Sequence, residues 1–390
     1  MSGRKLNKLI YPLALLALIG ALFAAGNRLG PDVGSLVRSL VPDSVTVEKS
    51  GPLFDLYTHS GGLRRPAGWA ATATGTGYGG PLLALSVFDS AGVLAGGQVI
   101  SHGETYVFYR LAKTGNIFET LAGRRYDSLA RGDYRIEVLS GASRTTRAVL
   151  ESIERAAAVV GREKFGYNRP ARKLPAEFGP TELTVIILFI VGVLADGGRL
   201  PREKLFRRAA QAAGLVVIGF WENSPITLAK LSALLLGYFP HPAESLFWYL
   251  LIGGFALTIL ATGKNIHCRY VCPFGALQSF LALTGGAGRS LPARVEKPVL
   301  AARNLIVFLA LFFALLLGKP GLASYEPFGI AFSLNGTIAH WLLLVVMAVS
   351  ALVIRRPWCR YFCPVQVFAE ALNSLRANVR ILWTATRKTG

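Results

Sequence analysis

Hydrophobic residues follow a different pattern in each half of the chain. From Leu183 onward, apolar blocks alternate with short polar stretches, and the blocks are Leu183–Ala195, Leu205–Phe220, Leu246–Thr262, Ala302–Leu317 and His340–Ile354. A helix that crosses a bilayer needs about 20 mostly apolar residues, so each block with its flanks predicts a transmembrane helix. Ile10–Ala25, after a basic start, predicts an uncleaved anchor as the sixth. Ile226–Phe239 contains Lys230 and leaves the helix count open by one.

Residues 27 to about 180 carry charges of both signs and only short apolar runs. Pro81–Phe88 and Val93–Ser101 flank an Asp-Ser-Ala-Gly turn, which predicts a β-hairpin. Tyr134–Leu139 predicts a further strand, and Arg147–Val160 has the apolar spacing of an amphipathic helix. This half is therefore predicted to be an α+β domain of ordinary size.

The charge distribution gives the predicted orientation. Only 16% of the 390 residues are charged, against about 25% in soluble domains, which favours a membrane protein. The net charge of +20 comes from basic residues in the N-terminus, the stretches 196–208 and 263–298, and the tail from Arg355. The positive-inside rule places these on the cytoplasmic side beside anionic lipid, and the α+β domain outside. No basic, aromatic-interleaved stripe supports a nucleic-acid partner.

The only four cysteines lie in one short block that occurs twice. The copies are Cys268-Arg269-Tyr270-Val271-Cys272-Pro273 and Cys359-Arg360-Tyr361-Phe362-Cys363-Pro364. Each follows an apolar block, so both are predicted at the cytoplasmic ends of their helices. Four thiolates from two loops suit one 4Fe-4S cluster, with the two arginines offsetting its charge. Buried structural cysteines, a zinc or copper site and dithiol–disulfide exchange are the alternatives, and the spacing does not choose among them.

Three stretches of the α+β domain are candidates for a phosphate-bearing ligand. They are Gly77-Tyr78-Gly79-Gly80-Pro81, His102-Gly103-Glu104-Thr105, and Glu137-Val138-Leu139-Ser140-Gly141-Ala142-Ser143. The third leads through Arg144-Thr145-Thr146 into the predicted helix, whose free N–H groups suit a phosphate. Capping of the helix is the commoner role of such hydroxyls. His102 with Glu104 suits either a ligand site or hydrogen bonding at a strand end.

Together these stretches resemble the FMN-binding domain of the NosR and RnfG/NqrC type. The resemblance implies that the residue at position 143 accepts FMN through a phosphoester bond. Glu137 and Ser143 replace the usual Asp and Thr, which leaves non-covalent FMN, or attachment at Thr145 or Thr146, open. The implied FMN-binding residues are Tyr78, Gly79, Gly80, His102, Glu104, Thr105, Glu137, Ser140, Gly141, Ala142, Ser143, Thr145 and Thr146.

The helical half resembles the NosR/NapH/PceC-like membrane proteins through its two cysteine blocks, and the resemblance covers about residues 45 to 372. NosR carries further ferredoxin motifs after the second block; this sequence ends at Gly390 without them, as in PceC-like members. The resemblance implies a 4Fe-4S cluster on Cys268, Cys272, Cys359 and Cys363.

The implied function is electron transfer in a bacterial inner membrane, from the cytoplasmic side or the quinone pool to an extracytoplasmic FMN. The implied partners are lipid, quinol, a flavin transferase and a periplasmic or exported respiratory reductase. The alternative is a maturation or regulatory protein with metal-trafficking or metal-reducing thiols. The expected domains are an anchor at 1–26, the FMN-binding domain at 45–165, a linker at 166–180, an all-α polytopic membrane domain at 181–375 and a cytoplasmic tail at 376–390.

Two further residues are interpreted from their positions. Glu326 lies near the end of a predicted span and is expected at the membrane interface, within a surface turn. His267 precedes the first cysteine and is a hydrogen-bond candidate for a cluster sulfur, although Trp358 takes its place in the second block.

Overall fold

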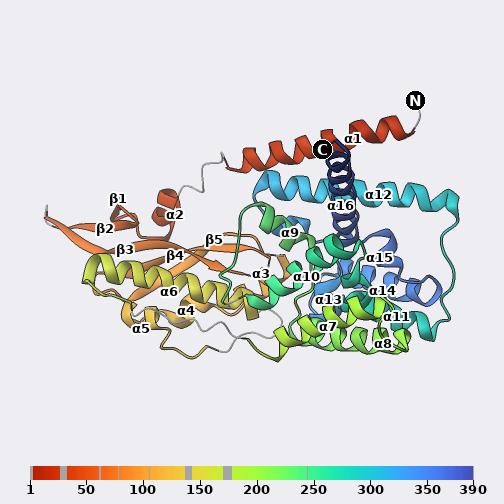
Figure 1. Cartoon of the computed structure of the whole chain (residues 1–390). Coiled ribbons are helices and arrows are strands. Elements are labelled where there is room, and N and C mark those ends of the chain that lie inside the picture. The colour runs from red at the N-terminus through yellow and green to blue at the C-terminus, as the bar shows by residue number, and fades with distance from the viewer. Residues whose placement is uncertain are drawn as a thin grey trace. The chain divides into compact units, whose positions relative to one another are not determined.

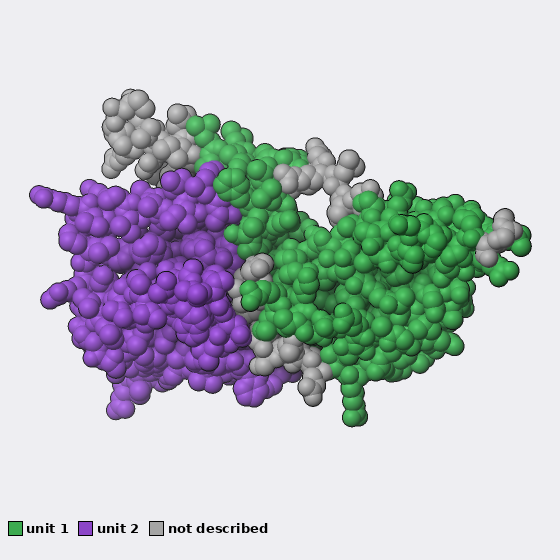
Figure 2. All heavy atoms as spheres, turned by 180° about the vertical axis from the view of Figure 1, so that it is seen from behind, with its two compact units in different colours: residues 1–173, 232–239, 312–322 green, residues 174–231, 240–311, 323–390 purple. Residues whose placement is uncertain are grey.

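A computed structural model describes residues 3–26, 33–60, 63–77, 79–104, 106–136, 143–169, 178–243 and 245–389. The chain divides into two compact units, shown in separate colours in Figure 2. Unit 1 contains residues 1–173, 232–239 and 312–322, and unit 2 contains residues 174–231, 240–311 and 323–390. Each unit is described by itself.

Unit 1 is built on a five-stranded antiparallel sheet in which each strand pairs with the next one along the chain (Figure 1). The strands are β1 (Val45–Ser50), β2 (Leu53–Ser60), β3 (Leu63–Thr76), β4 (Pro81–Asp89) and β5 (Leu94–His102). The predicted hairpin is confirmed as β4 and β5. Its turn is held by the Asp89 carboxylate, which accepts hydrogen bonds from the N–H groups of Ala91 and Val93, both at 2.9 Å.

Alternating side chains send the strands' apolar residues to both faces of the sheet, as the period of two requires. On one face Ala71, Leu82 and Phe88 pack against helix α6 (Ser143–Phe165). On the other face Ala70 and Leu85 join a smaller core with Val37 of helix α2 (Val33–Leu40). The described helices of this part are completed by α1 (Gly3–Gly26), α3 (Tyr106–Lys113), α4 (Ile117–Leu121) and α5 (Tyr126–Arg131).

One predicted element of unit 1 is confirmed and another is not. The amphipathic helix predicted at Arg147–Val160 is α6, which begins four residues earlier. The strand predicted at Tyr134–Leu139 is wrong for its described part, because residues 134–136 have no regular secondary structure. Tyr134 instead donates a 2.6 Å hydrogen bond from its hydroxyl to Glu154 of α6, so its ring is used in packing.

Unit 2 is helical in its described residues, and the apolar blocks of the sequence correspond to its longer helices. These are α7 (Pro180–Asp196), α8 (Glu203–Gly214) with a π-helical continuation (Leu215–Trp221), α10 (Leu246–Thr262), α12 (Ala293–Leu317), α14 (Ile338–Val353) and α16 (Pro364–Thr389). Shorter helices are α9 (Leu228–Leu235), α11 (Pro273–Thr284), α13 (Phe328–Ser333) and α15 (Pro357–Tyr361). Parts of α9 and α12 belong to unit 1.

One described helix, α12, has both the length and the hydropathy to cross a bilayer, with 25 residues and a mean hydropathy of 2.4 in its most apolar window. Three shorter apolar helices lie at Leu13–Ala24, Leu246–Thr262 and Ile338–Val353. The prediction of six spans therefore stays a prediction.

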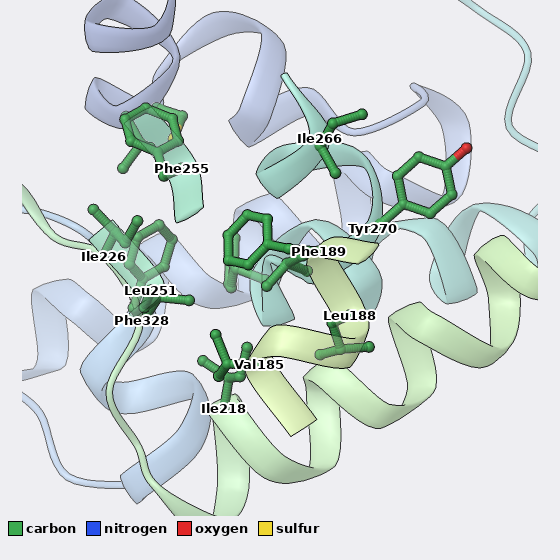
Figure 3. Close-up of a cluster of buried hydrophobic side chains, with 14 of the residues drawn as sticks. Val185, Leu188, Phe189, Ile218, Ile226, Leu251, Phe255, Ile266, Tyr270 and Phe328 are labelled. Atoms are coloured by element: carbon green, nitrogen blue, oxygen red, sulfur yellow. The ribbon is translucent and has the colours of Figure 1, made fainter. Parts of the chain in front are cut away.

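The core of unit 2 gathers large side chains from helices that are far apart in the sequence (Figure 3). Phe189 of α7, Phe255 of α10 and Tyr270 of the first cysteine block are all buried in it. The two cysteine blocks share a helical frame: α10 packs on α16, and α14 packs on α11. The helix that enters each block therefore packs against the helix that leaves the other, as a duplicated pair would.

Candidate cluster and flavin sites

Both cysteine blocks have the same backbone hydrogen bond at their second cysteine. The N–H group of Cys272 bonds to the carbonyl of His267 at 2.8 Å, and that of Cys363 bonds to the carbonyl of Trp358 at 2.9 Å. The next residue is a proline that begins α11 or α16, a position where a helix needs no N–H donor. Each block thus places one cysteine directly before the N-terminus of a helix.

These helix starts favour negative charge on the cysteine sulfurs. The N–H groups of Phe274 and Gly275 act on the sulfur of Cys272, and the N–H group of Gln366 acts on that of Cys363. Free N–H groups at a helix N-terminus stabilise nearby anions. The two blocks therefore offer thiolate ligands in equivalent surroundings.

All four cysteines are free thiols and lie close enough to influence one another. Burial raises the pKa of Cys272 to about 12, and the neighbouring Cys359 adds to the rise. Burial, followed by the charges of the other three thiols, raises the pKa of Cys363. Four mutually repelling thiolates need a cationic centre among them, and the iron of a cluster would supply that charge.

The space between the blocks is kept open by a glycine. A Cβ atom on Gly275 would lie 3.1 Å from the carbonyl oxygen of Cys268 and 3.7 Å from Sγ of Cys359. A tetrahedral zinc ion holds its sulfurs about 3.8 Å apart, whereas each thiolate of a four-iron cluster binds a different iron and lies farther from the others. Across the described part of the chain, no three His, Cys, Asp or Glu side chains are grouped to hold one metal ion.

The arginines inside the blocks do not have the role predicted for them. Arg269 forms ion pairs with Asp196 and Glu203, and Arg360 pairs with Glu296, so their charges are matched by carboxylates. The cation that acts on the thiols is Arg356, whose charge lowers the pKa of Cys359 against the effect of burial. Its Nη1 atom also donates a 2.9 Å hydrogen bond to the carbonyl of Cys268. Arg356 precedes the repeated motif, so motif reading missed it.

His267 and Trp358 occupy equivalent places, and both are 1% exposed. His267 lies between Phe189 and Phe255, with ring centroids 6.3 and 5.6 Å away, and burial lowers its pKa to about 3. Among the described residues, neither His267 Nδ1 nor Trp358 Nε1 has a hydrogen-bond partner. Each block therefore places a neutral ring with an unused nitrogen beside its first cysteine.

Two loops of the predicted flavin site meet in unit 1. The Glu104 carboxylate is 3% exposed and accepts a 3.1 Å hydrogen bond from the N–H group of Gly79. A Cβ atom on Gly77 would overlap that carboxylate, which explains why the loop before β4 needs glycine there. His102 ends β5 and stacks on Tyr109 at 3.8 Å, and burial lowers its pKa. The Gly-rich loop and the His-Gly-Glu stretch are therefore brought together as predicted.

The third stretch leads into the first turn of α6, which begins at Ser143. Thr145 and Thr146 are each 1% exposed, and their Oγ1 atoms have no hydrogen-bond partner among the described residues. Buried hydroxyls are normally satisfied, and a bound phosphate or ribityl chain would satisfy these. The helix start therefore fits the FMN group. Of the other predicted residues, Tyr78, Thr105, Glu137, Ser140, Gly141 and Ala142 lie outside the described residues.

Glu326 corrects another expectation, because it is 4% exposed and not interfacial. One carboxylate oxygen accepts a hydrogen bond from the N–H group of Leu228 in α9. Burial raises the pKa of Glu326 to about 7, against the opposing charge of Lys230, which is also 4% exposed. Lys230 donates to the hydroxyl of Ser224 at 2.7 Å. Sequence reasoning missed this buried polar group because its members lie almost 100 positions apart.

Two protein families match the chain in the regions just described. The family "4Fe-4S binding domain" matches residues 245–292 and 337–381, which contain the two cysteine blocks. The family "FMN-binding domain" matches residues 77–158, which run from the Gly-rich loop into α6.

Curated relatives match parts of the chain. Protein NirI of Paracoccus denitrificans is 30% identical over 203 residues, covering 46% of this chain and 29% of NirI. Regulatory protein NosR of Pseudomonas aeruginosa is 30% identical over 204 residues, covering 47% of this chain and 27% of NosR. Putative electron transport protein YccM of Escherichia coli is 26% identical over 148 residues, covering 34% of this chain and 40% of YccM.

The matched part thus spans well under half the length of each of these relatives. The two family matches lie in separate parts of the chain and identify FMN and a 4Fe-4S cluster as its cofactors. The chain is therefore similar to NosR-like FMN-binding proteins.

Proposed function

We propose that the chain carries electrons across a membrane, between a 4Fe-4S cluster on the cytoplasmic side and FMN on the other side. The observation that carries the proposal is the proximity of four free thiols, whose charges act on one another, in a chain that also holds an FMN-binding domain. FMN supplies both one- and two-electron chemistry, which suits it to a one-electron donor. The similarity to YccM, a putative electron transport protein, supports electron carriage. The proposed recipient is an extracytoplasmic reductase.

In this proposal the residues of the chain bind, orient and shield the cofactors. Cys268, Cys272, Cys359 and Cys363 hold the cluster, and the starts of α11 and α16 stabilise its negative charge. Glu104 orients the Gly-rich loop through Gly79, and the first turn of α6 offers Thr145 and Thr146 to the flavin phosphate or ribityl chain. The proposed domain borders are 45–165 for FMN binding and 181–375 for the membrane domain.

The membrane itself is part of the proposal. The hydrocarbon core of a bilayer is about 30 Å thick, too wide for a single efficient electron step. We assign the intermediate step to a quinol dissolved in the membrane, and flavin attachment to a separate transferase. The basic stretches 196–208 and 263–298 support a cytoplasmic position for the cysteine blocks in a bacterial inner membrane.

Cofactor analysis and vesicle transfer test the proposal together. Purified full-length chain should contain iron, acid-labile sulfide and FMN in fixed ratio. In vesicles that contain a membrane quinone and enclose ferricyanide, external dithionite should reduce the ferricyanide faster when the protein is present, and a Cys268→Ser variant should lose that gain. Stoichiometric cofactors without transfer would contradict electron carriage, and zinc or copper in place of iron would contradict the cluster.

A second candidate function is regulation or maturation of a reductase. The similarity to regulatory protein NosR favours it. In that role the FMN domain would be a binding module and the thiols would sense or reduce metal. The vesicle assay separates the two, because a regulator need not conduct electrons.

Flavin attachment is tested on the first turn of α6. In-gel fluorescence after denaturation detects covalent FMN. Ser143→Ala should abolish the band, whereas Thr145→Ala should keep it. A band that persists in Ser143→Ala and disappears in Thr145→Ala or Thr146→Ala would move the attachment point.

A further inference from the structure

One side chain links the two cysteine blocks. Gln278 lies in α11, is 1% exposed, and reaches residues of the second block about 80 positions away. Its Oε1 atom accepts a 2.9 Å hydrogen bond from the N–H group of Trp358. Its Nε2 atom donates to the carbonyl of Phe274 at 3.1 Å and to Sγ of Cys359 at 3.2 Å. Every polar atom of the amide is therefore used.

The orientation of the amide follows from its neighbours. The N–H group of Trp358 is a donor, so only the oxygen of Gln278 can face it. The NH₂ group must then face the carbonyl of Phe274 and the sulfur of Cys359, where both acceptors lie. A flipped amide would set donor against donor at Trp358 and oxygen against oxygen at Phe274.

Gln278 has no counterpart in the second block. The residue equivalent to it there is Ala369, which is also 1% exposed and carries no side-chain donor. The sulfur equivalent to Cys359 is that of Cys268. Asn265 serves Cys268: its side chain accepts a 3.0 Å hydrogen bond from the N–H group of Cys268 and also hydrogen-bonds to its thiol. The two sulfurs are thus bonded by different side chains, and that of Cys359 is reached from the helix of the other block.

We propose that Gln278 raises the reduction potential of the cluster by donating an N–H hydrogen bond to the Cys359 thiolate. Hydrogen bonds to the sulfurs are among the factors that set the potential of an iron–sulfur cluster. Reduction adds one negative charge to the cluster, so a donor at sulfur stabilises the reduced form more than the oxidised form. Gln278 is a positioning residue as well, since it holds the backbone of Trp358 next to that cysteine. The inference rests on the proposed assignment of the four cysteines as cluster ligands.

A redox titration of the full-length chain tests the inference, with the cluster followed by electron paramagnetic resonance. Gln278→Met keeps the length of the side chain and removes both bonds to the second block. We expect about a tenfold less favourable reduction equilibrium, which is about 59 mV lower for a one-electron couple. Thr284→Val, at the exposed end of the same helix, should leave the potential unchanged. The flavin potential in the same sample is an internal control and should not move.

A second variant guards against simple structural loss. Gln278→Glu keeps the oxygen that accepts from Trp358 and replaces the donor by a negative charge, so the potential should fall at least as far as with Met. An unchanged potential in both cluster-loaded variants would overturn the inference. Loss of the cluster from both variants, in protein that stays folded and retains FMN, would also overturn the inference, because Gln278 would then have only a structural role. If wild-type protein contains no iron and sulfide, the failure belongs to the proposed function instead.

Discussion

The two cysteine blocks share one motif and one backbone hydrogen bond, yet they are supported by different residues. In the first block the helix after the motif contributes Gly275 and Gln278. Gly275 leaves room beside the sulfurs, and Gln278 donates a hydrogen bond to Sγ of Cys359. In the second block the equivalent positions are Gln366 and Ala369. The comparison teaches that duplication preserved the ligands and that the surroundings diverged. The shared features should govern whether a cluster binds, and the features that differ should govern its reduction potential.

The largest expected effect comes from the ligands themselves. If both blocks hold one cluster, Cys268→Ser and Cys359→Ser should each abolish the whole iron and sulfide content, because a four-iron cluster needs all its thiolates. Ser350→Ala, at an exposed position of α14, is the control. Retention of half the iron in either cysteine variant would mean that each block binds its own centre.

The second-largest effect tests whether Gly275 leaves space for the cluster beside the cysteine sulfurs. Gly275→Val should lower cluster occupancy severalfold, because its side chain would enter the region between Cys268 and Cys359. Gln366→Ala, at the equivalent position, should leave iron content unchanged. Gly253→Val in α10 is the matched control, since a Cβ there meets nothing within 4 Å. Equal iron in the Gly275 and Gly253 variants would contradict the idea that Gly275 keeps the cluster space open.

A smaller effect compares the residues that hold the backbone of each block. Gln211 donates to the carbonyl of Arg269 at 2.8 Å, and Arg303 donates to the carbonyl of Arg360 at 3.3 Å and pairs with Glu370 at 2.7 Å. Gln211→Leu should cost about 1–2 kcal/mol, and Arg303→Met about 2–3 kcal/mol, since a charged hydrogen bond is also lost. Thermal unfolding in detergent measures both. A larger loss with Gln211→Leu would reverse the expected order.

The smallest effect concerns the arginines of the motif. Arg269 and Arg360 are about equally exposed, but Arg269 pairs with a buried carboxylate, Asp196, which Lys264 also contacts at 2.7 Å. Arg360→Gln should cost about 0.5 kcal/mol or less, as expected of an exposed pair, and Arg269→Gln about 1 kcal/mol. Neither should change the cluster potential by as much as Gln278→Met. A shift as large in Arg360→Gln would restore the predicted electrostatic role of the motif arginines.

Local patterns predicted the elements well, and distant contacts account for the errors. The hairpin of β4 and β5 and the helix α6 both follow from residues within a few positions. The burial of Glu326 depends on the N–H group of Leu228, 98 positions earlier, which no local pattern reveals. The role of Gln278 likewise cannot be predicted from the sequence, because a single glutamine in an apolar helix forms no recognisable motif.

The meander order of the sheet in unit 1 has a consequence for the order of assembly. Each strand pairs with its immediate predecessor, so all sheet contacts are local, and such topologies form quickly. Strands β1 to β5 can therefore pair as the chain emerges, before α6 has been made. The helix that begins at Ser143 follows the sheet in the chain and packs on β3 and β4. The proposed attachment point would then be completed only on a finished sheet, so flavin loading would report that the domain has folded.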